Sequence, residues 1–200
     1  MFAYIKGVLE EKNENYVVID VGGIGYKIFM PTNSIQQLPE RGENVKVHTY
    51  YYVREDNISL FGFTTLEELK MFELLLSVSG IGTKSALATL SEITPSAFAL
   101  SIITGDVSTL VKIPGVGNKT AQRMILELKD KLKTENAVAK PKTGELIENS
   151  QTGKALEEAS SALLVLGYTK KEIDQVLRDS QLASLSVEDM IKEALKRLSK

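Results

Sequence analysis

Two stretches of this chain carry nearly the same sequence. Residues 75–88 read LLSVSGIGTKSALA, and residues 110–123 read LVKIPGVGNKTAQR. In each, an apolar run leads to a turn of glycine, aliphatic residue and glycine, and a lysine follows at the start of a helical pattern. The matched positions are Leu75 and Leu110, Gly80 and Gly115, Gly82 and Gly117, Lys84 and Lys119, and Ala86 and Ala121. The chain therefore contains two copies of one helix–turn–helix unit.

Each copy has features that suit it to hold a phosphate. Glycine permits a tight turn whose backbone comes close to a ligand, and the helix that follows offers unpaired N–H groups and a positive dipole end. Lys84 and Lys119 add charge, and Arg123 lies one helical turn beyond Lys119. The alternative is an ordinary helical hairpin whose glycines only end helices, but the repetition favours DNA binding. The predicted DNA-binding residues are Ser79, Gly80, Gly82, Lys84, Gly115, Gly117, Asn118, Lys119, Thr120 and Arg123.

The second copy does not fit a nucleotide-binding loop. A P-loop needs four residues between its first glycine and an adjacent Gly-Lys pair, and it must follow a strand. In GVGNKT, at residues 115–120, one residue separates the glycines and Asn118 precedes the lysine. Neither copy completes the G-x-G-x-x-G of a dinucleotide site. We therefore expect no nucleotide cofactor.

The chain divides into four segments by composition and period. Residues 1–63 show five short strand patterns, which fit a small closed barrel such as the OB-fold. Residues 64–135 are helical apart from the two turns and breaks near Thr94-Pro95 and Gly105-Asp106, the latter offering N-caps. Thr65 or Thr64 with Glu68 predicts a capping box at the start of this segment. Residues 136–154 lose this periodicity and predict a flexible linker, and residues 155–200 recover three short amphipathic helices. The predicted class is α+β and multidomain: an OB-fold barrel, a helical domain and a C-terminal three-helix bundle.

Composition excludes several classes of function. The absence of cysteine excludes disulfides and thiolate metal sites, and His48, the single histidine, has no second ligand near it in sequence. No catalytic set stands out, so we expect neither a catalytic residue nor a metal. We find no signal peptide and no membrane-spanning run, which predicts a cytoplasmic protein. Since the net charge is −2, any DNA binding must come from local placement of charge.

An acidic pair lies in a short turn between two strand patterns. Residues 54–57 read REDN and include Glu55 and Asp56. Their simplest role is that of a solvated turn, but near a DNA-binding face they would repel phosphate and could steer strands. Residues 50–52 are three tyrosines that could stack on bases, although alternation in a strand favours core or subunit packing.

The whole chain resembles the RuvA family, the Holliday-junction-binding subunits of the bacterial branch-migration complex. The resemblance rests on the MFAYIKG opening with VGGIGY, on REDN before SLFGF, on the doubled GxGxK, and on the LGY at residues 166–168. It implies a barrel that assembles as a homotetramer, singly or as two tetramers face to face. On that basis two helix-hairpin-helix motifs per subunit hold the arms of a four-way DNA junction.

The resemblance also implies roles for other residues. Glu55 and Asp56 match an acidic pin at the crossover of the junction. Asn118 replaces a residue that is often basic in relatives, which would weaken DNA binding by the second helix-hairpin-helix motif. Partners would be the hexameric ATPase RuvB, which supplies ATP hydrolysis, and the resolvase RuvC. The residues expected to contact RuvB are Leu163, Leu166, Tyr168 and Leu195. The stripe that contains Leu163 and Leu166 suits the core of the three-helix bundle equally well.

Two other functions fit parts of the sequence. Helix-hairpin-helix motifs also occur in DNA repair enzymes such as glycosylases and nucleases, although the small helical domain leaves little room for a base-flipping pocket. An adaptor that uses the barrel and the tail only for protein contacts is the third. Our leading hypothesis is a non-catalytic junction-binding subunit that activates a motor ATPase.

Overall fold

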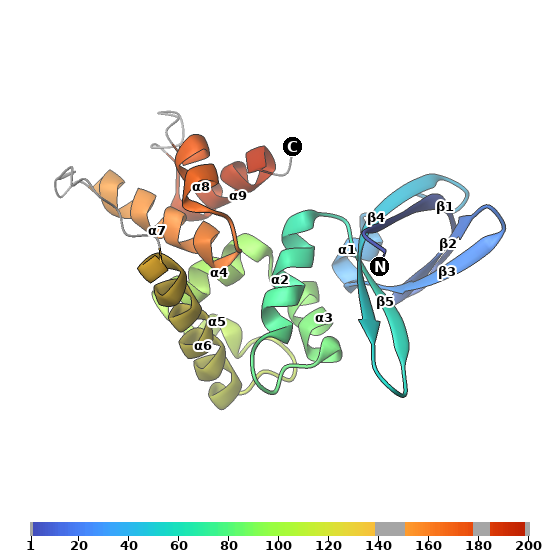
Figure 1. Cartoon of the computed structure of the whole chain (residues 1–200), viewed down its shortest axis with the longest axis horizontal. Coiled ribbons are helices and arrows are strands. Elements are labelled where there is room, and N and C mark those ends of the chain that lie inside the picture. The colour runs from blue at the N-terminus through green and yellow to red at the C-terminus, as the bar shows by residue number, and fades with distance from the viewer. Residues whose placement is uncertain (1, 139–150, 178–184, 199–200) are drawn as a thin grey trace.

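The computed structural model describes residues 2–138, 151–177 and 185–198. Its N-terminal part is a closed barrel with strand order β1-β2-β3-β5-β4 (Figure 1). Neighbouring strands are antiparallel except β3 and β5, which are parallel. The strands are β1 (Tyr4–Lys12), β2 (Tyr16–Val21), β3 (Ile24–Phe29), β4 (Asn44–Val53) and β5 (Ile58–Phe63). The expected OB-like barrel is confirmed, and a short helix that we did not expect, α1 (Thr32–Gln36), joins β3 to β4.

Alternation of apolar residues along the strands fills the barrel. Leu9, Val17, Ile28 and Val47 all have 0% of their surface exposed, because successive side chains point to opposite faces of a strand. The β2–β3 hairpin turns at Gly22 and Gly23, whose φ angles are 64° and 89°. Such angles favour glycine, which explains the glycine run at this point.

Helices make up the rest of the described chain. In the middle segment they are α2 (Leu66–Leu76), α3 (Thr83–Glu92), α4 (Pro95–Thr104), α5 (Val107–Leu110) and α6 (Asn118–Val138). The helix starts follow the capping residues seen in the sequence. Thr65 and Glu68 form the expected capping box of α2, Thr94 caps α4, and Asp106 caps α5 through the Thr109 N–H.

Aromatic packing fixes the barrel to the helices. The Phe72 ring of α2 lies 5.2 Å from that of Phe61 and 4.9 Å from that of Phe63, both on β5. Tyr50 also contacts Phe72, with ring centroids 5.5 Å apart, whereas Tyr51 packs on the other face of β4 against Phe2 at 5.4 Å. These tyrosines therefore pack within the protein, as the alternation favoured.

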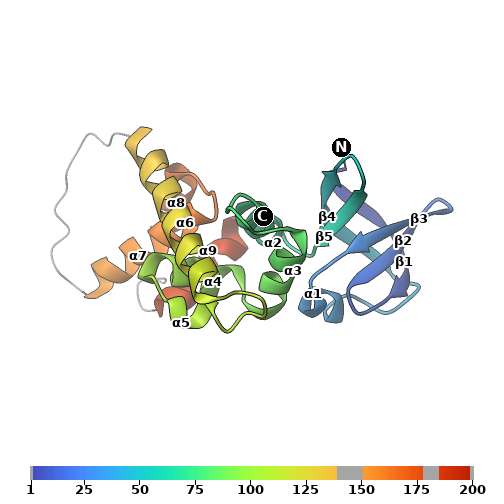
Figure 2. The same cartoon turned by 90° about the horizontal axis from the view of Figure 1, so that it is seen from below.

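Three C-terminal helices lie against the middle segment (Figures 1 and 2). They are α7 (Gln151–Val165), α8 (Lys170–Leu177) and α9 (Val187–Leu198). Helix α7 packs on α4, α6 and α9, so this bundle shares a core with the helical domain. The linker predicted at residues 136–154 is too long at both ends, because α6 continues to Val138 and α7 begins at Gln151. Residues 139–150 lie outside the described residues.

The four residues expected to contact RuvB are all buried. Leu163 has 0%, Leu166 2%, Tyr168 5% and Leu195 7% of its surface exposed. They belong to the core that joins α7–α9 to the middle helices. Their burial agrees with the alternative that the apolar stripe forms a core, and it does not provide the exposed surface that docking would need. Helical spacing cannot separate core from docking residues, since both are apolar stripes.

Tyr168 joins the C-terminal helices to α2. Its hydroxyl donates a hydrogen bond to Glu67 Oε1 at 3.2 Å, and the Lys70 ammonium lies 3.4 Å from the centre of its ring. Burial and the Glu67 carboxylate raise the pKa of the Tyr168 phenol, so the hydroxyl stays protonated and remains a donor. Because its pKa is raised, this stabilisation is present below the ordinary tyrosine value of about 10 and is lost only at more alkaline pH.

We expect Tyr168→Phe to lower the free energy of unfolding by about 1–3 kcal/mol, because a buried carboxylate loses its donor. Chemical denaturation at neutral pH measures the change. Glu67→Gln is the matched control, since an amide oxygen still accepts from Tyr168 and should cost less. An unchanged midpoint for Tyr168→Phe would show that the bond contributes nothing to docking.

Candidate nucleic-acid interface

The two glycine turns have the same backbone conformation. Gly80 has φ 86° and Gly115 has φ 82°, values that favour glycine. The hydrogen bonds repeat as well: Ile81 N to Val78 O at 3.1 Å and Val116 N to Ile113 O at 3.0 Å, then Ala86 N to Gly82 O and Ala121 N to Gly117 O, both at 2.9 Å. The sequence repeat is therefore a structural repeat.

Each turn is held from inside by its aliphatic residue and presents its glycines to solvent. Ile81 and Val116, between the glycines, have only 7% and 5% of their surface exposed. The residues at the turn surface are exposed in both copies: Ser79, Gly80, Gly82, Lys84, Gly115, Gly117, Asn118 and Lys119; Thr120 is partly buried. A Cβ at Gly82 or Gly117 would meet no atom within 4 Å, so bare backbone is offered outward at both turns.

Helix N-termini and lysines follow both turns. Helix α3 begins after Gly82 without a side-chain cap, so its first N–H groups are available to a ligand. Lys84 and Lys119 lie in the first turns of α3 and α6. Within the described residues neither lysine pairs with a carboxylate. Backbone donors, a positive helix end and a free ammonium thus occur together twice.

Arg123 has a protein partner that the sequence did not reveal. Its Nη1 donates to the Ser79 carbonyl at 3.1 Å, which places it between the two turns. Glu127, which we did not select from the sequence, accepts a hydrogen bond from the Ser79 N–H at 3.0 Å. Its only signal in the sequence is its place four residues beyond Arg123, on the same face of a helix.

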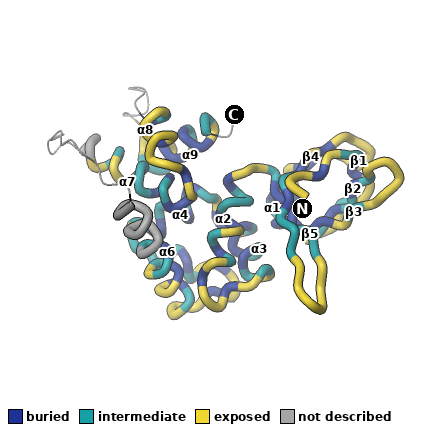
Figure 3. The backbone as a smooth tube through the Cα atoms, in the orientation of Figure 1, coloured by how far each residue is buried: buried dark blue, intermediate teal, exposed yellow. Residues whose placement is uncertain are grey.

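The acidic pair occupies the turn between β4 and β5. The Arg54 N–H donates to the Asn57 carbonyl at 2.8 Å, which extends the pairing of β4 and β5 and leaves Glu55 and Asp56 at the exposed tip of the hairpin. Arg54 Nε donates to the Tyr52 hydroxyl at 2.9 Å. This turn and both glycine turns project toward the same side of the molecule, the lower side in Figure 1, where Figure 3 shows exposed backbone.

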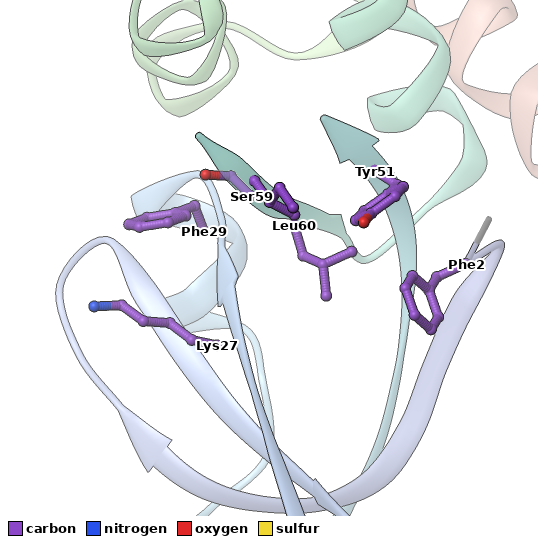
Figure 4. A pocket seen from close by; sticks show the side chains of 7 residues that line it. Phe2, Lys27, Phe29, Tyr51, Ser59 and Leu60 are labelled. Atoms are coloured by element: carbon purple, nitrogen blue, oxygen red, sulfur yellow. The ribbon is translucent and has the colours of Figure 1, made fainter. Parts of the chain in front are cut away.

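The barrel carries a mainly apolar hollow (Figure 4). Its volume is about 340 Å³, and its lining comprises Phe2, Lys27, Phe29, Tyr51, Ile58, Ser59 and Leu60. This lining contains no acid, base or nucleophile set. His48 lies elsewhere, and in the described ranges no three His, Asp or Glu side chains gather as a metal site would require.

No single helix within the described residues is long and apolar enough to cross a membrane. Helices α3 and α4 together pass the length and composition criteria, but they are bent by 99° at the break between them.

Comparisons with known proteins match the chain in three parts. Residues 1–62 match the RuvA N-terminal domain, residues 72–130 match a SAM-like helix-hairpin-helix tandem, and residues 154–199 match the RuvA C-terminal domain. The helix-hairpin-helix match covers both glycine turns and the helices around them.

Full-length relatives agree with these matches. A protein of Acetivibrio thermocellus is 48% identical over 100% of both chains. One from Ruminiclostridium cellulolyticum is 46% identical over 99% of this chain and 100% of the relative, and one from Caldanaerobacter subterraneus is 46% identical over 100% of both. Each is named Holliday junction branch migration complex subunit RuvA.

Proposed function

This chain belongs to the RuvA family, and from that premise we propose that it binds four-way (Holliday) DNA junctions as the non-catalytic subunit of a branch-migration complex. The observation that carries the proposal is the pair of structurally equal glycine turns, each exposed and followed by a free lysine. We call each glycine turn, with its helix N-terminus and its lysine, a grip. Two equal grips per subunit suit a ligand with a repeating charged backbone, and an assembly of four subunits would present two grips to each arm of the junction.

Binding of this kind reads no sequence. The groups at both turns are backbone N–H donors, helix N-termini and lysines, which contact phosphate rather than base edges. Branch migration moves the crossover through whatever sequence the arms contain, so a contact that ignores bases is the appropriate one. The net charge of −2 is compatible with this, because the exposed Lys84 and Lys119 place positive charge at both turns whatever the total charge of the chain.

The acidic turn has the opposite effect on DNA from the grips, because it repels phosphate. The β4–β5 hairpin, whose tip carries Glu55 and Asp56, projects on the same side as the glycine turns (Figure 1). At the centre of a four-fold assembly they would repel phosphates and keep the exchanging strands apart. A single polypeptide would thus attract duplex arms at its grips and exclude backbone from the crossover.

Assembly and partners complete the proposal. We assign residues 1–63 to homotetramer assembly and the acidic turn, residues 64–135 to DNA, and residues 155–200 to the motor. The exposed apolar side chains of the barrel support self-association, since Phe2 is 41% and Ile58 is 65% exposed. A cytoplasmic hexameric ATPase, RuvB, would supply the energy, and RuvC would cut the junction. Because the predicted contact residues are buried, the motor would meet exposed faces of α8 and α9.

The competing hypothesis is a DNA repair enzyme, a glycosylase or nuclease. The relatives compared above are named as complex subunits, and the described residues form no catalytic set at the turns. When purified protein is incubated with a mobile junction, without RuvB or ATP, we expect a shifted complex but neither cleavage nor base release. Denaturing gels after alkali treatment measure both, with a junction resolvase as the positive control. Strand breaks above background would reject the proposed function.

A further inference from the structure

Two side chains of α6 bracket one residue of the first glycine turn. Arg123 Nη1 donates to the Ser79 carbonyl at 3.1 Å, and the Ser79 N–H donates to the Glu127 carboxylate at 3.0 Å. Arg123 and Glu127 are four residues apart and therefore adjacent on one helix face. Since α6 begins at the second glycine turn, the helix of the second grip holds the backbone of the first.

The bracket runs in one direction only. Aligning the two repeats places Ala88 of α3 at the position of Arg123 and Glu92 at the position of Glu127. Alanine has no donor for a carbonyl, so α3 cannot return the contact to the second turn. The two turns therefore have the same backbone conformation, but only the first turn is contacted by an arginine from the helix of the other repeat.

The Ser79 N–H has no counterpart in the second turn. Pro114 occupies the matching position there, and proline has no N–H to donate. Glu127 therefore accepts from a backbone donor that is not part of what the two turns share.

A carboxylate beside a phosphate-binding turn should by itself oppose DNA binding. Glu127 is partly buried, and its carboxylate accepts from the Ser79 N–H of the turn at 3.0 Å. Arg123 also lies against the turn, since a Cβ added at Gly80 would lie 3.2 Å from Arg123 Nη1. Both side chains thus contact the first turn.

We propose that Arg123 and Glu127 are positioning residues that fix the spacing between the two glycine turns, so that both engage one duplex backbone together. This inference rests on the proposed junction binding. Two linked grips gain from each other only when their separation matches the ligand, and a spacing set before binding avoids the cost of ordering it during binding. Arg123 is exposed, so its predicted contact with DNA stays a prediction, and its positioning role acts through Ser79.

Two substitutions at one position separate positioning from charge. Glu127→Gln removes the charge but keeps an oxygen that accepts from the Ser79 N–H. Glu127→Asp keeps the charge but is one methylene shorter and loses the contact. We expect junction affinity close to that of the unsubstituted chain for Glu127→Gln and roughly tenfold weaker for Glu127→Asp. If Glu127 acted only by repelling DNA, Glu127→Gln would bind more tightly and Glu127→Asp would be unchanged.

A double-mutant cycle tests whether the effect passes through the grips. Fluorescence anisotropy of a labelled four-way junction is measured for Glu127→Asp, Lys119→Ala and the combined variant, all in the full chain. Because spacing matters only while both grips hold, Glu127→Asp should cost less in the Lys119→Ala background than alone. Circular dichroism and native mass spectrometry verify fold and assembly. Full additivity would overturn the inference.

The outcomes keep the two proposals apart. If the unsubstituted chain does not prefer a four-way junction, the proposed function fails. If it does, and Glu127→Asp binds as tightly as Glu127→Gln, the positioning role fails while the function stands.

Discussion

A Lys84→Ala/Lys119→Ala variant is expected to lose four-way-junction affinity by on the order of 100-fold or more at physiological salt. Both lysines are exposed and neither pairs with a carboxylate in the described residues, so their charges are available to phosphates. A tetramer would lose two cations from each subunit. If each lysine neutralises one phosphate, the slope of log affinity against log salt should become shallower by about seven.

The measurement is a titration of labelled junction by fluorescence anisotropy at several salt concentrations. Lys170→Ala/Lys171→Ala is the matched control, because it removes the same charge from exposed positions on α8. That control should change the salt slope little. Equal losses in both variants would mean that only total charge matters, and an unaffected Lys84→Ala/Lys119→Ala variant would favour the protein adaptor.

A Glu55→Gln/Asp56→Asn variant is expected to bind linear duplex more tightly and to lose on the order of tenfold in its preference for junctions over duplex. The two carboxylates lie at the exposed centre of the β4–β5 turn. Their repulsion of phosphate should weaken the binding of a duplex that runs across the centre of the tetramer. It should not weaken the binding of a junction whose strands separate at that centre. Neutral amides keep the size and the turn propensity while removing the charge.

Competition between unlabelled duplex and labelled junction measures this preference directly. Glu10→Gln/Glu11→Gln serves as the control, since both residues are exposed on β1 and the variant has the same change in net charge. An unchanged preference in the Glu55→Gln/Asp56→Asn variant would show that the acidic pair only forms a turn.

Much of the fold follows from local patterns. The strand alternation predicted the barrel, and Thr65 with Glu68 marked the start of α2 as a capping box. These predictions succeeded because period, turn chemistry and capping depend on residues within a few positions of each other. The bounds of the linker were the least accurate of these predictions, because a loss of amphipathic period does not mark the residue at which a helix ends.

Part of the candidate site could be predicted from the sequence and part could not. The equal backbone of the two turns was predictable, since Gly80 and Gly115 adopt the left-handed conformation that glycine permits at low cost. The partner of Arg123 was not, because Ser79 is distant in sequence and reaches it only when the two hairpins pack. The sequence pattern around an arginine near a phosphate-binding turn is the same whether the arginine contacts DNA or a backbone carbonyl.

The sequence by itself determined the elements: a closed barrel, two equal glycine turns with their lysines, and an acidic turn between β4 and β5. Each depends on short-range steric and hydrogen-bonding rules. Only the tertiary structure decided which apolar and charged side chains remain available. It placed Leu163 and Tyr168 in a shared core, and it directed Glu127 to the first turn. The reason is physical: burial and long-range hydrogen bonds depend on how helices pack, and an amphipathic pattern leaves the choice of partner open.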